Sequence, residues 1–203
     1  SFPLLAIPFF VLAGEVMNAG GISKRIVDLP LKLVGHKRGG LGYVAIIASV
    51  LMASLSGSAA ADTAALGMVL LPMMAKVGYA PGRSAGLIAT GGIIAPIIPP
   101  SIPFIIFGVA SGVSISKLFL AGIAPGILMG AVLSFVWWWQ SRAVGTAVSE
   151  KSASSEVWRS VKEGLWALML PVLIVGGFRS GMFTPTEAGA IAAIYALFIA
   201  LFI

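Results

Sequence analysis

Cysteine is absent from the 203 residues of this chain, and histidine occurs only once, at His36. Without cysteine, disulfide bonds and thiolate metal sites are excluded. Without a second histidine, the paired-histidine motif of a zinc enzyme is excluded as well. His36 stands in the basic turn His36–Arg38, a setting that favours a surface residue over a catalytic one.

Charged residues are also scarce, at 10% of the chain, while hydrophobic residues make up 59%. The mean hydropathy is +1.05. Because a soluble domain carries about 25% charged residues, the composition predicts an integral membrane protein. The 25 glycines and 12 prolines are typical of closely packed and broken membrane helices, so we expect an all-α fold.

Motifs for nucleotide chemistry and nucleic-acid binding are missing too. The chain has no Walker-type glycine–lysine loop and no carboxylate pair at helical spacing, so we expect no enzyme and no organic cofactor. The net charge of +6 arises between apolar segments, without the interleaved aromatic residues of a nucleic-acid patch. Membrane topology explains these charges, so the expected partner is a lipid membrane and no nucleic acid. The sequence lacks an initial methionine and both its ends are apolar, which predicts a fragment of a longer protein.

One apolar segment, Tyr43–Ala75, exceeds an ordinary membrane span of ~20 residues and holds a polar group at its midpoint, Ser54–Thr63. Within hydrocarbon, irregular backbone persists only where protein or a watery cavity satisfies it. We therefore predict a re-entrant hairpin over residues 43–75. Tyr43–Leu55 descends to mid-membrane, Ser56–Ser58 turns, and Ala59–Ala75 returns to the same side.

The basic residues agree with this hairpin, because such residues collect on the cytoplasmic side of a membrane. Lys37 and Arg38 precede the segment, and Lys76 and Arg83 follow it. A straight crossing would separate these two pairs, whereas a hairpin keeps them together. With the hairpin, 11 of the 13 basic residues lie on the cytoplasmic side, and only Lys117 and Arg179 lie on the opposite side.

A second interruption falls inside Ser84–Ser111, a stretch long enough to cross a membrane. It is caused by four prolines: Pro96, Pro99, Pro100 and Pro103. Each proline lacks an N–H group and rejects the carbonyl four residues earlier. The carbonyls deprived of helical partners are those of Gly92, Ala95, Pro96 and Pro99. This exceeds a simple kink, so we predict a helix broken into two halves over residues 84–111, with Ser101 capping the second half.

The remaining segments complete four expected regions. Residues 1–42 hold a first membrane helix, Phe2–Met17, and a basic amphipathic helix on the cytoplasmic surface, Ile22–Leu33. Residues 43–117 hold the hairpin and the broken helix. Residues 118–163 hold a return helix, a polar linker and an interfacial arm that begins at Glu156. Residues 164–203 hold two scaffold helices, the second with Thr186 as its expected N-cap.

The helix ends at two breaks at mid-depth are suited to binding a cation and an anion. Carbonyls at the C-terminal end of a half-helix suit a dehydrated Na⁺, while N–H groups at the N-terminal end suit a carboxylate. The candidate Na⁺ ligands, through side chain or carbonyl, are Ser54, Ser56, Gly57, Ser58, Pro96, Pro99 and Ser101. Asp62 and Thr63 are placed in the vicinity of the substrate or the ion. No metal other than Na⁺ is expected.

Each of these assignments has a simpler structural alternative. The serine hydroxyls can bond the carbonyl four residues earlier, which serves helix packing only. Asp62 can be an acid in the first turn of the returning helix, and this alternative is as well supported as a ligand role. Glu15, near the end of the first helix, is best read as an interfacial acid that faces water or a neighbouring helix.

Several motifs, in this order, resemble the large membrane subunit of TRAP (tripartite ATP-independent periplasmic) transporters. They are Ala6–Met17, Gly20–Ile22, Val34–His36, Ser56–Ser58, Ala61–Gly67, Pro96–Ile102 and Phe183–Ala188. The resemblance implies Na⁺-driven import of organic acids across a bacterial or archaeal inner membrane. It also implies a periplasmic substrate-binding protein and a small four-helix membrane subunit as partners. The implied fold has two inverted repeats that move as an elevator, and this chain carries only the first.

Two other functions stay open at this point. One is a related elevator-type transporter that works without a binding protein, and the other is a non-transporting membrane scaffold. A sugar acid, a dicarboxylate and a keto acid would leave similar traces in this half of the protein, so the substrate is open too.

Overall fold

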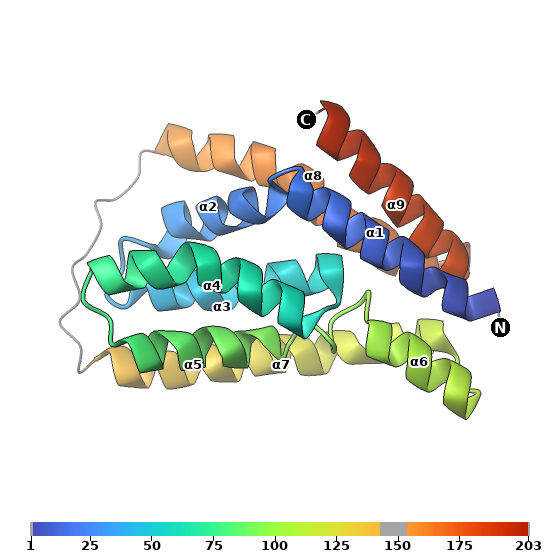
Figure 1. The fold of residues 1–203 in the computed structure, drawn as a ribbon, viewed down its shortest axis with the longest axis horizontal. Helices are drawn as coiled ribbons and strands as arrows, with labels where there is room; N and C mark the ends of the chain where they lie inside the picture. The colour runs from blue at the N-terminus through green and yellow to red at the C-terminus, as the bar shows by residue number, and fades with distance from the viewer. Residues whose placement is uncertain (1, 143–153, 203) are drawn as a thin grey trace.

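The computed structural model describes residues 2–142 and 154–202, and this part of the chain is helical without a β-strand. Figure 1 shows an elongated bundle with the N-terminus at one end. The elements are η1 (Phe2–Leu5), α1 (Ala6–Ala19), α2 (Ile22–Val34), α3 (Gly40–Ser56), α4 (Ala59–Lys76), α5 (Pro81–Gly92), α6 (Ile102–Ser111), α7 (Ile115–Ser141), α8 (Ser154–Arg179) and α9 (Pro185–Phe202). The all-helical prediction is confirmed.

Four of the described helices are long and apolar enough to cross a membrane: Phe2–Ala19, Ala59–Lys76, Ile115–Ser141 and Pro185–Phe202. The pair Glu156–Trp166 and Leu168–Arg179, bent by 44°, makes a fifth candidate if it is counted as one span. The predicted arm and the crossing after it are therefore one bent helix, α8. Most of the predicted polar linker, residues 143–153, lies outside the described residues.

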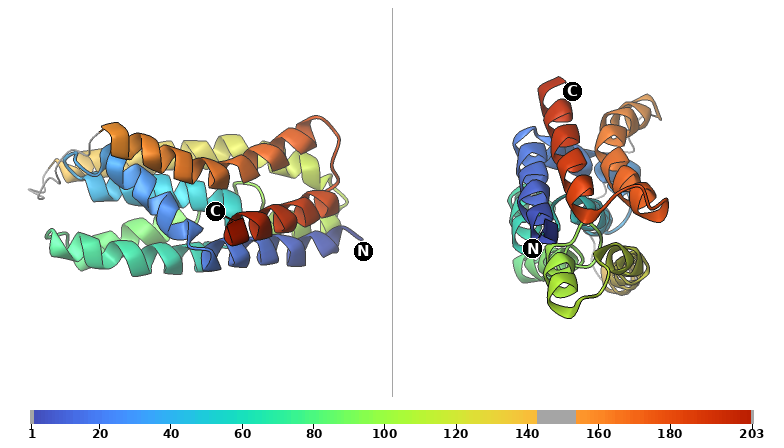
Figure 2. Two further views of the ribbon diagram at one scale, coloured as in Figure 1. Left: turned by 90° about the horizontal axis from the view of Figure 1, so that it is seen from above. Right: turned by 90° about the vertical axis from the view of Figure 1, so that its right-hand side faces the viewer.

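The 27-residue helix α7 runs along the bundle, and different helices lie beside its two halves. The antiparallel pair α3 and α4 covers the half where α7 ends, so the turn between them lies near the middle of the molecule (Figures 1 and 2). Helices α5 and α6 follow one another along the bundle, with an irregular stretch between them at the same level. The predicted hairpin shape and the predicted break are both present.

A second group of helices packs beside the hairpin. Helices α1 and α9 cross closely, since a β-carbon at Gly189 would come within 3.1 Å of Phe9 Cβ. Helix α2 runs obliquely from mid-length to the end of the bundle (Figure 2), between α3 and α8. There Lys32 Nζ donates a hydrogen bond of 2.6 Å to Ser160 Oγ. Whether α2 lies at a membrane surface stays a prediction.

Aromatic side chains join α7 to its neighbours at two levels. Phe119 packs edge-on against Phe10 and Phe178, with ring centroids 6.3 and 5.4 Å apart. Near the other end of α7, the buried Trp137 stacks on Tyr79 at 5.9 Å and donates a hydrogen bond of 2.9 Å to the Gly39 carbonyl. The second contact attaches the start of the hairpin to α7.

Two local predictions need correction. The broken span begins at Pro81 and leaves helical geometry after Gly92, before the first of the four prolines. At the last helix the N-cap is Thr184 and not Thr186. Thr184 Oγ1 accepts from the Glu187 N–H at 3.4 Å, while Glu187 Oε2 accepts from the Thr184 N–H at 2.8 Å. This reciprocal arrangement is a capping box, and Thr186 instead donates to the Phe2 carbonyl at 3.1 Å.

Candidate functional site

The turn of the hairpin consists of Gly57 and Ser58. Gly57 has φ +60°, a left-handed conformation that glycine adopts without steric cost. Ser58 is extended and caps α4, because its Oγ accepts a hydrogen bond of 3.4 Å from the Ala61 N–H. The predicted turn at Ser56–Ser58 is thereby confirmed, with Ser56 as the last residue of α3.

The turn of the hairpin touches the break between α5 and α6. A β-carbon at Gly57 would overlap the Pro100 carbonyl oxygen and would lie 3.3 Å from the Ser101 Cα. Only a glycine allows this approach. Two irregular segments that are separated by about forty residues in the sequence therefore meet inside the described bundle, as a shared site requires.

Ser101 organises the break, as the sequence predicts. It is fully buried, caps α6 by accepting a 3.3 Å hydrogen bond from the Phe104 N–H, and donates to the Pro96 carbonyl. The Gly92 carbonyl accepts from the Ala95 N–H at 3.2 Å. Two of the four carbonyls that lose helical partners to proline thus have donors within the chain. The bond between Pro99 and Pro100 is cis.

Glycines on the buried face of α7 accommodate the break. A β-carbon at Gly122 would overlap the Ile97 carbonyl oxygen, and one at Gly126 would overlap the Ile98 side chain. The irregular backbone therefore packs directly on α7. Protein covers it on this side, which is the condition for such backbone at membrane depth.

The other predicted ligands occupy less suitable positions. Ser54 is buried, and its Oγ donates a hydrogen bond of 2.6 Å to the Leu51 carbonyl in its own helix. The acceptor lies three residues earlier, and not four as in the packing alternative. Thr63 packs against Gly92, where a β-carbon would overlap its Oγ1. It therefore helps to hold α4 against α5. For Ser56 only the backbone is described.

A cavity of about 120 Å³ lies beside the turn of the hairpin. It is lined by Val11, Gly14, Glu15, Met17, Asn18, Met52, Leu55, Ser58, Ala61, Asp62, Ala65 and Ile102. Asp62 lies in the first turn of α4, as predicted, and is only 1% exposed. Glu15 reaches the same cavity from α1, so two carboxylates line it.

Sequence reasoning assigned Glu15 to the membrane interface and did not connect it with Asp62. The available signal was an acid inside an apolar helix, which is a functional candidate by default. No group of three or more His, Cys, Asp or Glu side chains occurs among the described residues. A cation held here would therefore depend on hydroxyl and carbonyl oxygens together with at most two carboxylates.

The sequence was compared with known families and proteins. The family model described as tripartite ATP-independent periplasmic transporter, DctM component, matches residues 1–203. The chain belongs to the DctM family. This confirms the resemblance seen in the motifs and makes the chain part of a multi-pass inner-membrane protein.

Curated members of the DctM family are similar along the whole chain. A 2,3-diketo-L-gulonate TRAP transporter large permease protein of Escherichia coli (strain K12) is 69% identical over 200 residues, covering 98% of this chain and 47% of the relative. A putative TRAP transporter large permease protein of Haemophilus influenzae is 66% identical, covering 100% and 48%. A C4-dicarboxylate TRAP transporter large permease protein of Rhodobacter capsulatus is 39% identical, covering 100% and 49%.

The chain spans about half the length of these relatives. The expectation of a fragment is therefore confirmed. The relatives are named as permeases, which agrees with the prediction that the chain is not an enzyme.

Proposed function

We propose that the full-length protein imports a small organic acid across the inner membrane, driven by Na⁺, and that this chain supplies the first half of the transport site. The observation that carries the proposal is the contact between Gly57 and the Pro100–Ser101 backbone. It brings the end of α3 and the starts of α4 and α6 to one place, within a family of transporter components.

The charges at these helix ends suit an ion and an anionic substrate. Helices α4 and α6 begin at the contact, so their N-termini offer N–H groups and partial positive charge. Ser58 and Ser101 each occupy one of these groups as a cap, and a helix start has four. Helix α3 ends at the same place, and its last carbonyls suit Na⁺.

The hairpin is re-entrant in this proposal, with both its ends on the cytoplasmic side. Lys37 and Arg38 precede α3, and Lys76 ends α4, so these charges collect at one end of the bundle. The other end carries the turns after α6 and α8, near Lys117 and Arg179. Helix α4 alone has the length of a span, but its pairing with α3 and the charge distribution favour a return.

The family description names one component of a tripartite system. We therefore propose a periplasmic substrate-binding protein and a small membrane subunit as the other two partners. A second repeat in the missing half of the protein would complete the site. The two repeats would then carry it across the membrane in an elevator movement.

The substrate is best sought among sugar-derived keto acids. The 69% identical relative is named for 2,3-diketo-L-gulonate, whereas the relative named for C4-dicarboxylates is only 39% identical. A carboxylate is common to both classes, and the helix N-termini at the contact suit that group.

The experiment is uptake of labelled 2,3-diketo-L-gulonate into proteoliposomes that hold the full-length protein, its small subunit and the binding protein. We expect accumulation with an inward Na⁺ gradient and none with an equal K⁺ gradient. Accumulation without the binding protein would favour a transporter that works alone. Absence of Na⁺-dependent accumulation of this acid and of C4-dicarboxylates would contradict the proposal.

A further inference from the structure

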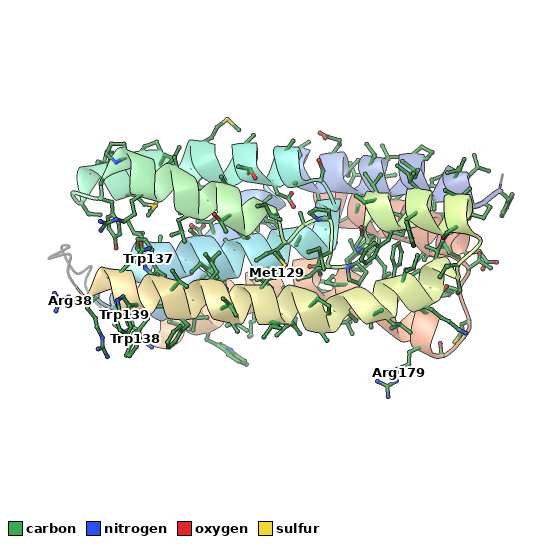
Figure 3. All side chains as sticks on the ribbon, turned by 90° about the horizontal axis from the view of Figure 1, so that it is seen from below. Arg38, Met129, Trp137, Trp138, Trp139 and Arg179 are labelled. Carbon is green, nitrogen blue, oxygen red and sulfur yellow. The ribbon has the colours of Figure 1, made fainter. Side chains whose placement is uncertain are left out.

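Three basic residues gather at the end of α7 that carries the tryptophans. They are Lys37, Arg38 and Arg142, all exposed. Arg38 Nη2 donates a hydrogen bond of 2.8 Å to the Arg142 carbonyl, and the Arg142 guanidinium lies 3.6 Å from the centre of the Trp138 ring. Figure 3 shows Arg38 beside Trp137, Trp138 and Trp139 at this end of the molecule.

These basic side chains line a pocket of about 450 Å³, called here the basic pocket. Its lining residues are Val34, Lys37, Arg38, Tyr43, Ile47, Ser134, Trp138, Ser141 and Arg142. No carboxylate is among these described residues, so nothing in the lining compensates the three positive charges. The pocket is therefore suited to a ligand with negative charge.

An apolar groove of about 260 Å³ adjoins the basic pocket between α3 and α7. It is lined by Ile46, Ile47, Val50, Leu51, Ile127, Gly130, Ala131 and Ser134. Ile47 and Ser134 line both spaces, so the basic pocket is continuous with the apolar groove. Ser134 and Ile127 are about two helical turns apart, roughly 10 Å along α7.

We propose that the basic pocket and the groove together bind one anionic phospholipid. Its phosphate lies among Lys37, Arg38 and Arg142, and one acyl chain follows the groove between α3 and α7. Basic pockets between membrane helices on the cytoplasmic side hold anionic headgroups, and tryptophans at a helix end mark headgroup depth. Free phosphate would satisfy the basic residues but would leave the groove unexplained.

The bound lipid would join the start of the hairpin to α7, since Lys37 and Arg38 precede α3 and Arg142 follows α7. Trp137 already makes such a contact through the Gly39 carbonyl. This inference does not depend on Na⁺ coupling or on the identity of the substrate, because it concerns the face between two helices and not the turn of the hairpin.

The test is native mass spectrometry of the full-length protein after reconstitution in equimolar phosphatidylglycerol and phosphatidylcholine. We expect the wild type to retain phosphatidylglycerol preferentially. The double variant Arg38→Gln/Arg142→Gln should retain roughly thirtyfold less phosphatidylglycerol. Each basic residue near a membrane surface contributes about 1 kcal/mol of attraction to anionic lipid, and about 2 kcal/mol for two residues corresponds to roughly thirtyfold. The matched control is Arg179→Gln, an exposed arginine at the opposite end of the molecule (Figure 3), which should behave as the wild type.

A second pair of variants tests the acyl chain without changing any charge. Ala131→Phe fills the groove and should also reduce retention, whereas Ala124→Phe, at another exposed position of α7, should not. Equal retention by all variants would overturn the proposal. So would a wild type without bound phosphatidylglycerol, which would leave the groove to a protein segment. Full displacement of the lipid by glycerol phosphate, with no effect of Ala131→Phe, would indicate a free-phosphate site and would also overturn it.

Discussion

Gly57 carries the central contact of the molecule for two separate reasons. Its φ of +60° favours glycine, and its missing side chain leaves room for the Pro100 carbonyl. Gly78 shares only the first property, with φ +86° and no atom within 4 Å of a β-carbon. A comparison of Gly57 with Gly78 therefore distinguishes the effect of backbone strain from the effect of the close contact.

We predict that Gly57→Ala destabilises the full-length protein more than Gly78→Ala does. Both variants bear the left-handed backbone cost of about 1–2 kcal/mol. Gly57→Ala additionally forces the hairpin away from the break, and such overpacking typically costs about 1–3 kcal/mol. Thermal unfolding of the purified variants in one detergent gives the comparison. Similar midpoints for the two variants would contradict the close contact.

At the residue scale, the sequence predicted what glycine, serine and proline determine locally. The turn at Gly57 and the cap at Ser101 follow from backbone chemistry that acts within a few residues. The sequence did not predict the meeting of Glu15 and Asp62 at one cavity, because that depends on how α1 packs against α3 of the hairpin. The prediction of Thr186 as the N-cap was wrong because two threonines precede Glu187. Thr184 is the cap, since it forms the reciprocal hydrogen bonds of a capping box with Glu187.

At the scale of elements, the antiparallel pair α3 and α4 agrees with a segment that returns, and not with one straight crossing of residues 43–75. The described chain shows the antiparallel pair, and in the proposed topology the basic residues place both of its ends on the cytoplasmic side. Periodicity could not have shown this, because a long apolar segment has the same pattern whether it returns or crosses.

We predict that single cysteines at Lys37 and Lys76 are both labelled from the cytoplasmic side, and that a cysteine at Ser114 is labelled from the periplasmic side. This half of the protein has no cysteine of its own, so it adds no background. Membrane-impermeant maleimide on intact cells and on inverted vesicles provides the measurement. Labelling of positions 37 and 76 from opposite sides would rule out the re-entrant hairpin.

The first part of α8 is the second element with a testable role. Its Trp158 is 61% exposed, with Lys162 Nζ 5.7 Å from the ring centre, while Ser160 on the other face bonds Lys32 of α2. One face thus packs on the bundle, and the other presents an aromatic ring suited to a membrane interface.

We predict that Trp158→Glu reduces assembly in the membrane or transport more than Arg159→Gln does. The first change places a charge where an interfacial ring lies, and the second neutralises a charge at a neighbouring exposed position while keeping a polar side chain. Yields of folded protein by size-exclusion chromatography, together with uptake rates, provide the measurement. Equal tolerance of both changes would make this segment a plain linker.

At the scale of the whole molecule, we propose that this chain supplies one half of the transport site. The described bundle holds one hairpin and one broken helix in contact, while its relatives are about twice as long. The composition and charge distribution were sufficient to predict a membrane protein. In the proposed function the remaining ligands come from the second half of the full-length protein, so the substrate could not be predicted from this sequence.

The central claim is that the turn of the hairpin and the break bind the coupling Na⁺. Its most direct test is the initial uptake rate against Na⁺ concentration in proteoliposomes, at a fixed concentration of binding protein. The test variants are Ser56→Ala, Ser58→Ala, Ser101→Ala and Asp62→Asn. The matched control is Ser84→Ala, because Ser84 is buried near the start of α5, at the opposite end of this helix from the break, and donates to the Ala80 carbonyl at 3.2 Å.

A lost oxygen ligand should cost about as much as one hydrogen bond, about 1 kcal/mol, which corresponds to roughly five- to tenfold in ion affinity. We therefore predict that half-saturation moves to higher Na⁺ concentration for Ser58→Ala and stays unchanged for Ser84→Ala. A large shift in half-saturation for Asp62→Asn would show that Asp62 acts as an ion ligand. A small shift would show that it only stabilises the N-terminal end of α4. Na⁺ curves that match the wild type for all three serine variants at the turn and the break would contradict the account and move the ion site to the other half of the protein.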